Sequence, residues 1–315
     1  MRIERLASYG RERTLIRVSG WTPSIHRDAM LILGVLCGLA QATGVLAVPI
    51  DAVAYWEAGQ SQNLYPEHWS EVATGYLFYP PPVAQLMTFL QPIGWPAFVT
   101  ILTTAIFASM WYCAGRWSWV LLALGLPFLL FKIGPQVAAT FLGYALMGNL
   151  QWILAALTIV ALRHPAVWSI QLVTKVTSAI GWWWHPLRGE WRAAAIGAGA
   201  SIAIIAISFA LSPALWFEFI DFVGRNGTMS DPPLEAFFVP FGIRLATAVP
   251  LVVWGARTNR PWTVPVACGW SLPALYGLGF LVFWVAATRL VERPPSLDLS
   301  RFEVGRRWRE VRVRG

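Results

Sequence analysis

Long runs of apolar residues recur along the chain, and they constrain its fold more than any other feature of the sequence. The clearest runs are residues 30–49, 97–115, 117–131, 152–162, 193–211, 237–254 and 264–290. A helix needs about 20 residues to cross the hydrocarbon core of a bilayer, and several runs approach that length. Only 13% of the 315 residues are charged, whereas an ordinary soluble domain carries about 25%. We therefore expect an integral membrane protein.

The apolar runs predict an all-α fold, a polytopic transmembrane bundle of about eight to ten spans within residues 29–290. Several runs are short or are separated by a single charge, so tilted or broken helices are expected among them. One break is expected between Lys175 and Arg188, where the chain is too short for two complete crossings. Backbone that leaves the helix at membrane depth is tolerated where it lines a cavity.

Positive charge is concentrated at the two ends of the chain and in its short connections. The net charge is +8, and residues 1–28 and 291–315 form two basic tails. Residues 50–96 contain no Lys or Arg, and residues 212–236 form a second, mostly acidic segment. Because basic segments stay in the cytoplasm during insertion, we expect cytoplasmic termini and two outward-facing loops. The tails are expected to contact anionic membrane lipids, and this distribution disfavours nucleic acid as a partner.

Asp51 is the first candidate for chemistry, because it lies where the first apolar run ends and the longest outer segment begins. Long ordered loops often carry function. A carboxylate in such a place is partly desolvated, and burial or a nearby charge can tune its pKa for general-base work. Position alone favours a simpler interpretation, in which Asp51 only ends the span or caps the next helix.

The residues after Asp51 form a pattern that favours the chemical interpretation. In order they are Asp51, Tyr55-Trp56, Ala58-Gly59, Leu64-Tyr65 and Tyr79-Pro80-Pro81, after which a helix is expected to begin. This pattern resembles the first outer loop of glycosyltransferase family 87, whose members have a GT-C membrane fold and use polyprenyl-phosphate sugars. Gly148-Asn149 and Lys175 add fainter similarities, with Asn149 where the family usually has Gln. The resemblance covers residues 30–210.

The resemblance implies an inverting transfer of a hexose, with mannose as the expected sugar, from a polyprenyl-phosphate donor to a lipid-linked or glycan acceptor. Asp51 would deprotonate the acceptor hydroxyl as general base. The residues expected to bind substrate lie in the first outer loop and are Tyr55, Trp56, His68, Tyr79 and Pro80. The leaving group is an anionic polyprenyl phosphate, which cations stabilise. The cations expected to bind the donor phosphate are Lys175, Arg225 and Arg244.

Such a transfer requires no cofactor, and the chain contains neither a dinucleotide-binding G-x-G-x-x-G nor a Walker sequence. No metal site is predicted, because the four His residues are scattered and lack the spacing of zinc ligands. A divalent cation held by carboxylates is left open. The chain is expected in the plasma (inner) membrane of a bacterium or archaeon, as a multi-pass protein with its active site facing outside.

Each candidate cation also has a structural alternative. Lys175 lies inside an apolar run, where an ionisable group is costly and therefore a functional candidate, although it could instead snorkel to the interface. Arg225 could form a solvated ion pair with Asp221, and this alternative is favoured. For Arg244 snorkelling and function are equally expected. His68 could be an ordinary solvated loop residue.

Two further classes of function are consistent with the same sequence. A lipid or glycolipid transporter (a flippase) without transferase activity would use the same cations to guide a phosphate headgroup across the bilayer. It predicts a polar pathway that reaches both faces of the membrane. A non-catalytic subunit of a cell-envelope complex would need no pocket near Asp51, because general-base work requires hydrogen-bond reach.

Overall fold

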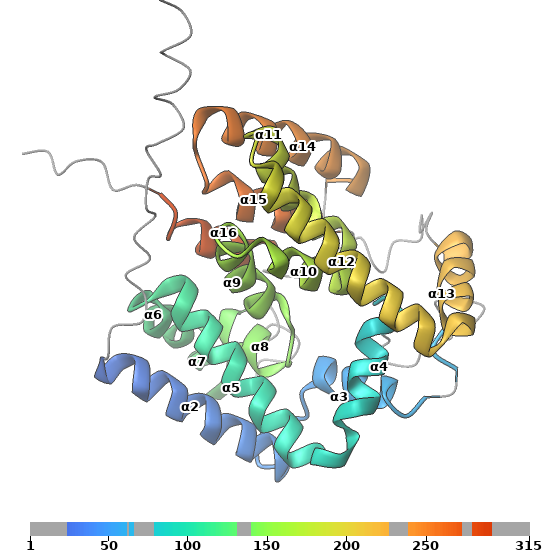
Figure 1. Ribbon diagram of the computed structural model, residues 1–315. Coiled ribbons are helices and arrows are strands. Elements are labelled where there is room, and N and C mark those ends of the chain that lie inside the picture. Colours follow the sequence, from blue (N-terminus) through green and yellow to red (C-terminus); the bar gives the residue numbers. More distant parts are fainter. Residues whose placement is uncertain are drawn as a thin grey trace, which may run out of the picture.

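The computed structural model describes residues 24–61, 63–65, 79–130, 140–226, 239–272 and 279–291, and the structural statements below concern these residues. All regular structure in these ranges is helical, which confirms the predicted all-α class (Figure 1). His68 and the two basic tails up to residue 23 and from residue 292 lie outside the described residues.

Three of the described helices are long and apolar enough to cross a membrane. They are α2 (Ile25–Ala42), α5 (Trp95–Ala114) and α12 (Trp191–Leu211). Ser24 caps the start of α2 with its hydroxyl, which accepts a hydrogen bond from the backbone N–H of Arg27 at 3.3 Å. These three helices support a membrane protein, whereas the eight to ten spans and the orientation stay predictions.

The structure describes further helices, most of which are short. They are α3 (Ile50–Ala58), α4 (Pro81–Leu90), α6 (Trp117–Ala123), α7 (Leu126–Leu130), α8 (Phe141–Leu146), α9 (Gln151–Ala161), α10 (Trp168–Thr174), α11 (Trp184–Leu187), α13 (Pro213–Asn226), α14 (Phe241–Thr258), α15 (Thr263–Trp270) and α16 (Gly279–Ala287), with 3₁₀ turns η2 (Gln91–Ile93), η4 (Pro165–Val167) and η5 (Val176–Trp183). The apolar run 117–131 therefore contains two short helices, and the run 264–290 contains α15 and α16 as separate elements.

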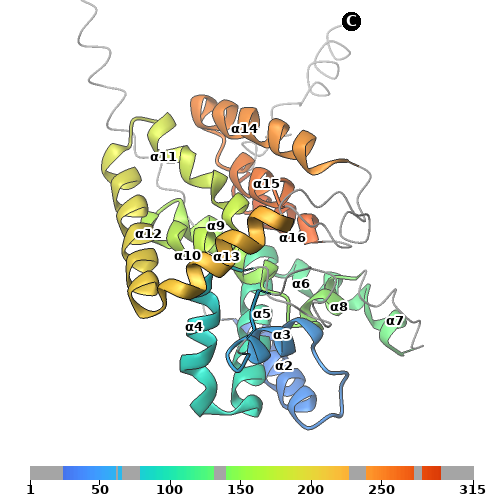
Figure 2. The same cartoon turned by 90° about the vertical axis from the view of Figure 1, so that its right-hand side faces the viewer.

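The helices form one bundle, with α2 and α5 on one side and α14, α15 and α16 on the opposite side (Figures 1 and 2). Between them lie α9 and α10, and the long α12 packs against α10 along one flank of the bundle (Figure 2). The core contains fully buried aromatic side chains, including Trp152, Trp168, Phe107 and Phe283. Helix α13 runs from the end of α12 across the bundle in the second view (Figure 2).

The described arginines of the connections collect at one end of this bundle. Arg188, which precedes α12, donates to the side chain of Asn259 just after α14 at 2.9 Å, so these two helix ends meet. Gly115, which follows α5, lies next to Arg289, which follows α16. The antiparallel packing of α2 on α5 brings Arg27 to the same end, whereas Asp51 in α3 lies toward the other. The two segments predicted to face outward lie partly outside the described residues, so the orientation of the charged segments stays a prediction.

The segment from α9 to α11 forms a hairpin whose apex is Lys175. Helix α10 ends there, because Lys175 has φ −133° and ψ 87°, and the chain then turns back as η5. A 3₁₀ helix of eight residues is unusually long, since runs beyond about four are uncommon. Buried Gln171 holds the hairpin, donating to the Leu154 carbonyl at 2.6 Å and accepting from Ser178 at 2.8 Å. The structure therefore contains the broken helix expected in this region.

Two glycines let α2 and α5 approach closely. Gly34 and Gly38 are four residues apart and face the α5 backbone, the arrangement of small residues that membrane helices use for close packing. A Cβ at Gly38 would lie 2.6 Å from the Thr100 Cα and 3.2 Å from its carbonyl oxygen. Backbone atoms on a packed helix cannot rotate away as a flexible side chain can.

We expect Gly38→Ala to lower the unfolding temperature in detergent, because the added methyl forces α2 and α5 apart. Overpacking of this kind typically costs about 1–3 kcal/mol. Gly199→Ala in α12 is the matched control, since a Cβ there meets nothing within 4 Å. It should leave the unfolding temperature unchanged or raise it slightly, because Gly in a helix costs about 1 kcal/mol relative to Ala. Equal effects of the two substitutions would contradict the close contact.

Candidate functional site

The candidate site is built where the start of α3 meets the turn between α8 and α9. The backbone N–H of Asp51 donates to the Met147 carbonyl at 3.0 Å. Gly148 follows with φ +79°, a conformation that favours glycine, and a Cβ on it would lie 2.7 Å from the Ala52 Cβ. Glycine is therefore required here for both conformation and space. The close approach places Asn149 directly beside Asp51.

Asn149 holds one oxygen of the Asp51 carboxylate. Its side-chain nitrogen Nδ2 donates to Asp51 Oδ2 at 2.7 Å, and its oxygen Oδ1 accepts from the backbone N–H of Gln151 at 2.9 Å. The second bond settles the orientation of the amide, because only the oxygen can accept from a backbone N–H. Within the described part of the chain, Asp51 Oδ1 accepts no hydrogen bond.

Asp51 is partly buried, and this environment changes its acidity. Burial raises the pKa of Asp51 above its usual value, while the hydrogen bond from Asn149 and the charge of Lys175 act in the opposite direction. The raised pKa makes the carboxylate a stronger base than an exposed aspartate. The opposing contributions keep an ionised form accessible. This combination suits a group that removes a proton from a hydroxyl.

Lys175 reaches the same site from the apex of the hairpin. Its ammonium lies 5.3 Å from the centre of the Tyr79 ring, within the range of a cation–π contact. Its charge also acts on Asp51. Among the described residues, no carboxylate lies within salt-bridge distance of Lys175. No described carboxylate therefore occupies the donors of this ammonium, and an anion could accept hydrogen bonds from them.

Hydrogen bonds link three buried tyrosines, one in α3 and two among the described residues that precede α4. The hydroxyls of Tyr55 and Tyr79 lie 3.2 Å apart, and the Tyr65 hydroxyl donates to the Tyr79 carbonyl at 2.9 Å. Burial raises the pKa of Tyr55 well above its usual value, with Tyr79 and Asp51 adding to the shift. Tyr55 therefore stays protonated. Pro80 follows Tyr79 as the residue before α4, whose first position is a second proline suited to a helix start.

The other predicted residues have partners of their own. Trp56 packs on Phe98, with ring centres 5.1 Å apart. Arg225 pairs with Asp221 at 3.0 Å on exposed α13, the alternative that the sequence favoured. Arg244 is 1% exposed and its guanidinium donates to the carbonyls of Val239, Trp270 and Leu272. The structure thus brings Asp51, Tyr55, Tyr79 and Lys175 together, whereas Trp56, Arg225 and Arg244 form contacts elsewhere.

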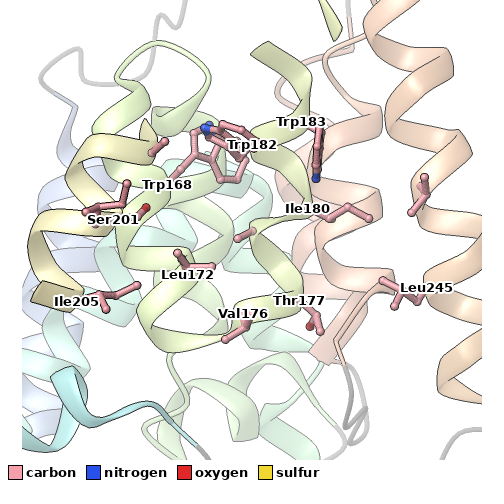
Figure 3. A pocket seen from close by; sticks show the side chains of 14 residues that line it. Trp168, Leu172, Val176, Thr177, Ile180, Trp182, Trp183, Ser201, Ile205 and Leu245 are labelled. Carbon is pink, nitrogen blue, oxygen red and sulfur yellow. The ribbon is translucent and has the colours of Figure 1, made fainter. Parts of the chain in front are cut away.

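An apolar cavity of about 540 Å³ lies beside the hairpin and was not predicted from the sequence. Figure 3 shows Val176 and Thr177 at one end, Trp182 and Trp183 at the other, and side chains of α12 and α14 on opposite sides. Val176, which directly follows Lys175 in the chain, is one of the lining residues. The sequence offers little signal for it, because four separate elements contribute the lining.

Two of the residues that line this cavity each carry a polar atom that has no hydrogen-bond partner within the described residues. They are Trp168 Nε1 and Thr177 Oγ1, and both are buried. Such groups are usually paired in folded proteins. No group of three or more His, Cys, Asp or Glu residues in the described ranges could hold a metal ion.

The comparisons with known proteins add no identification. No protein-family model, no curated protein and no solved structure matches the chain. The relation to glycosyltransferase family 87 therefore rests on the residues quoted above and stays a resemblance.

We expect Asp51→Asn to stabilise the protein at neutral pH. The folded-state pKa of Asp51 is raised above its ordinary value near 3.8, so the fold is penalised once the pH exceeds that value. Asn is neutral and can still accept the hydrogen bond from Asn149. The unfolding temperature should rise by about 2 °C or more at pH 7.5, and the gain should shrink as the pH approaches 4.

Glu57→Gln is the matched control, because Glu57 is exposed on the same helix. It should change the unfolding temperature little at either pH. Asp51→Ala should be less stable than Asp51→Asn, since it leaves the Asn149 amide without its acceptor. A gain for Asp51→Asn that is the same at both pH values would show that ionisation of Asp51 is not the cause.

Proposed function

We propose that the protein is a polytopic membrane glycosyltransferase of the GT-C type. It moves a hexose, with mannose as the first sugar to test, from a polyprenyl-phosphate donor to a lipid-linked or glycan acceptor. The observation that carries the proposal is a partly buried carboxylate, Asp51 held by Asn149, next to the charge of Lys175, whose ammonium has no carboxylate within salt-bridge distance among the described residues. A base and a cation at one site are the two groups that this transfer needs.

The chemical step follows from that pairing. Asp51 Oδ1 takes the proton of the acceptor hydroxyl, and the hydroxyl oxygen attacks the anomeric carbon of the donor sugar. The bond between that carbon and the phosphate oxygen breaks, and its electrons leave with the polyprenyl phosphate. Lys175 stabilises the charge on this leaving group by charge-assisted hydrogen bonds. Attack on the face opposite to the phosphate inverts the configuration, and no cofactor is consumed.

The cavity beside Lys175 supports a lipid carrier rather than a water-soluble nucleotide sugar. Its lining is predominantly apolar, with residues from α10, η5, α12 and α14 (Figure 3). Such a lining favours a hydrocarbon chain over a charged, hydrated group. A phosphate held at Lys175 would continue directly into the cavity through its attached prenyl chain. Because the lining is apolar, the cavity does not provide the polar pathway expected of a transporter.

The distribution of positive charge supports a location of the Asp51 site on the outer side of the membrane. The connecting arginines gather at the end of the bundle away from Asp51, and basic segments face the cytoplasm. We infer an orientation with the termini in the cytoplasm and the Asp51 site on the outer side of the plasma membrane.

The test is transfer of labelled mannose from polyprenyl-phosphate mannose into a lipid extract by the purified protein in detergent. We expect Asp51→Asn to lower the turnover by about 10²–10⁴-fold, the usual contribution of a general base. Glu57→Gln should retain the wild-type rate. Full activity of Asp51→Asn, with its stability intact, would refute the role of the base. No transfer from mannosyl or glucosyl donors by the wild type would favour a transporter instead.

Lys175 is tested by the dependence of the rate on donor concentration. Lys175→Met removes the charge but keeps a long, flexible side chain, so it should lose donor affinity and turnover together. Removing a charge-assisted contact to the leaving group should cost at least about tenfold in kcat/KM. Lys175→Arg should recover part of that loss, because it restores the positive charge. Equal rates for the Lys175→Met and Lys175→Arg variants would show that the charge of Lys175 does not contribute to transfer.

A further inference from the structure

The end of the bundle away from Asp51 contains a partly buried cation, Arg289, that forms no salt bridge with any described residue. Arg289 follows α16, and two of its guanidinium nitrogens, Nε and Nη2, are buried without a hydrogen-bond partner among the described residues. Its third nitrogen, Nη1, lies beside Gly115 at the end of α5. Burial of an unpaired guanidinium is costly, and buried charges are normally paired. An anion bound at this position would offset that cost.

The surroundings of Arg289 add positive charge and one hydroxyl. The guanidinium carbon lies 5.4 Å from the centre of the Tyr112 ring. The charge of Arg163, at the end of α9, also acts on the Tyr112 hydroxyl. Arg116 follows Gly115 directly and is exposed. Within the described residues, none of these three arginines forms a salt bridge, and the acids at this end, Asp28 and Glu190, pair with other residues.

The neighbouring surface indicates which anion is available. Helix α5 is a candidate membrane span that ends at Ala114, so Gly115 and Arg116 lie at the level where a span meets the lipid headgroups. Trp117 is 72% exposed and directly adjoins Arg116. Tryptophan is enriched at membrane interfaces, and basic pockets between spans on the cytoplasmic side bind phosphate headgroups. A phosphate ester of the bilayer is therefore the anion available at this level.

We propose that Arg289, with Arg163, Arg116 and the Tyr112 hydroxyl, binds the phosphate of an anionic phospholipid at the cytoplasmic end of α5 and α16. The site takes one headgroup between the ends of α5, α9 and α16, and the Arg289 guanidinium makes its deepest contact. This lipid is structural and separate from the substrates of the transferase. The inference rests on the membrane placement of α5 but not on the proposed transferase activity.

The test measures binding to the full chain in neutral detergent. Thermal unfolding is followed while phosphatidylglycerol is added, with phosphatidylcholine and inorganic phosphate in parallel titrations. Phosphatidylglycerol should raise the unfolding temperature in a saturable manner, since a ligand that binds only the folded state stabilises it. Phosphatidylcholine should have little effect at the same concentrations. Native mass spectrometry should show one phosphatidylglycerol molecule retained by the wild type.

Substitutions of single arginines test which residues bind the phosphate headgroup. Arg289→Gln should raise the apparent Kd for phosphatidylglycerol at least about tenfold, because it removes a charge-assisted pair. Arg163→Gln should weaken binding less, and it provides a second test if Arg289→Gln does not fold. Arg257→Gln is the matched control, an exposed arginine at the end of α14 that should leave binding unchanged.

Three results would overturn the proposal. One is equal stabilisation of the wild type, Arg289→Gln and Arg163→Gln by phosphatidylglycerol. Another is a wild type that no lipid stabilises, which would mean that a group of the chain itself neutralises Arg289. The third is inorganic phosphate matching phosphatidylglycerol at equal concentration, which would assign the site to a free anion. Loss of mannose transfer has no bearing on any of these readouts, so the two proposals fail independently.

Discussion

The packing of Gly148 against Ala52 is the contact on which the arrangement of the candidate site depends. With φ +79° and no side chain, Gly148 lets the α8–α9 turn touch the first turn of α3. That contact brings Asn149 to Asp51 and at the same time orients the Asn149 amide through the Gln151 N–H. A rigid backbone contact thus positions a carboxylate that would otherwise be free to rotate. Preorganisation of this kind reduces the cost of forming a reactive geometry.

The break at Lys175 is stable because the side chains around it replace the hydrogen bonds that a continuous helix would provide. The Lys175 carbonyl accepts from the backbone N–H of Ser178 at 2.8 Å, and the Ser178 hydroxyl bonds both that carbonyl and Gln171. A broken helix at membrane depth needs such partners. The break also releases Lys175 from α10 and directs it to Tyr79 and Asp51. The same feature therefore explains the unusual backbone and the position of the charge.

Local sequence patterns predicted the helical class and the interruption after Lys175, because each depends on neighbouring residues, whereas the orientation of the basic and acidic segments stays a prediction. The first outer loop also singled out Asp51, Tyr55 and Tyr79, which the structure brings together. The role of Arg244 could not be anticipated, since its carbonyl partners lie up to 28 residues away and only the folded chain reveals them. The cavity was missed for the same reason. Neither its lining nor its unpaired polar atoms form a pattern along the sequence.

The partners of the buried or membrane-level cations divide them into two groups. Arg244 and Arg225 are bonded within the protein, so their charges are already balanced by carbonyls or a carboxylate. Lys175 and Arg289 make only ring contacts with described residues. An unpaired charge in a low-dielectric setting is costly, so its persistence favours a ligand. The two cations lie toward opposite ends of the bundle. If both bind phosphate, one at the Asp51 site and the other at the arginine-rich end, the two contacts would fix the depth of the bundle in the bilayer. The Asp51 carboxylate would then be held at a constant height relative to a lipid-borne donor.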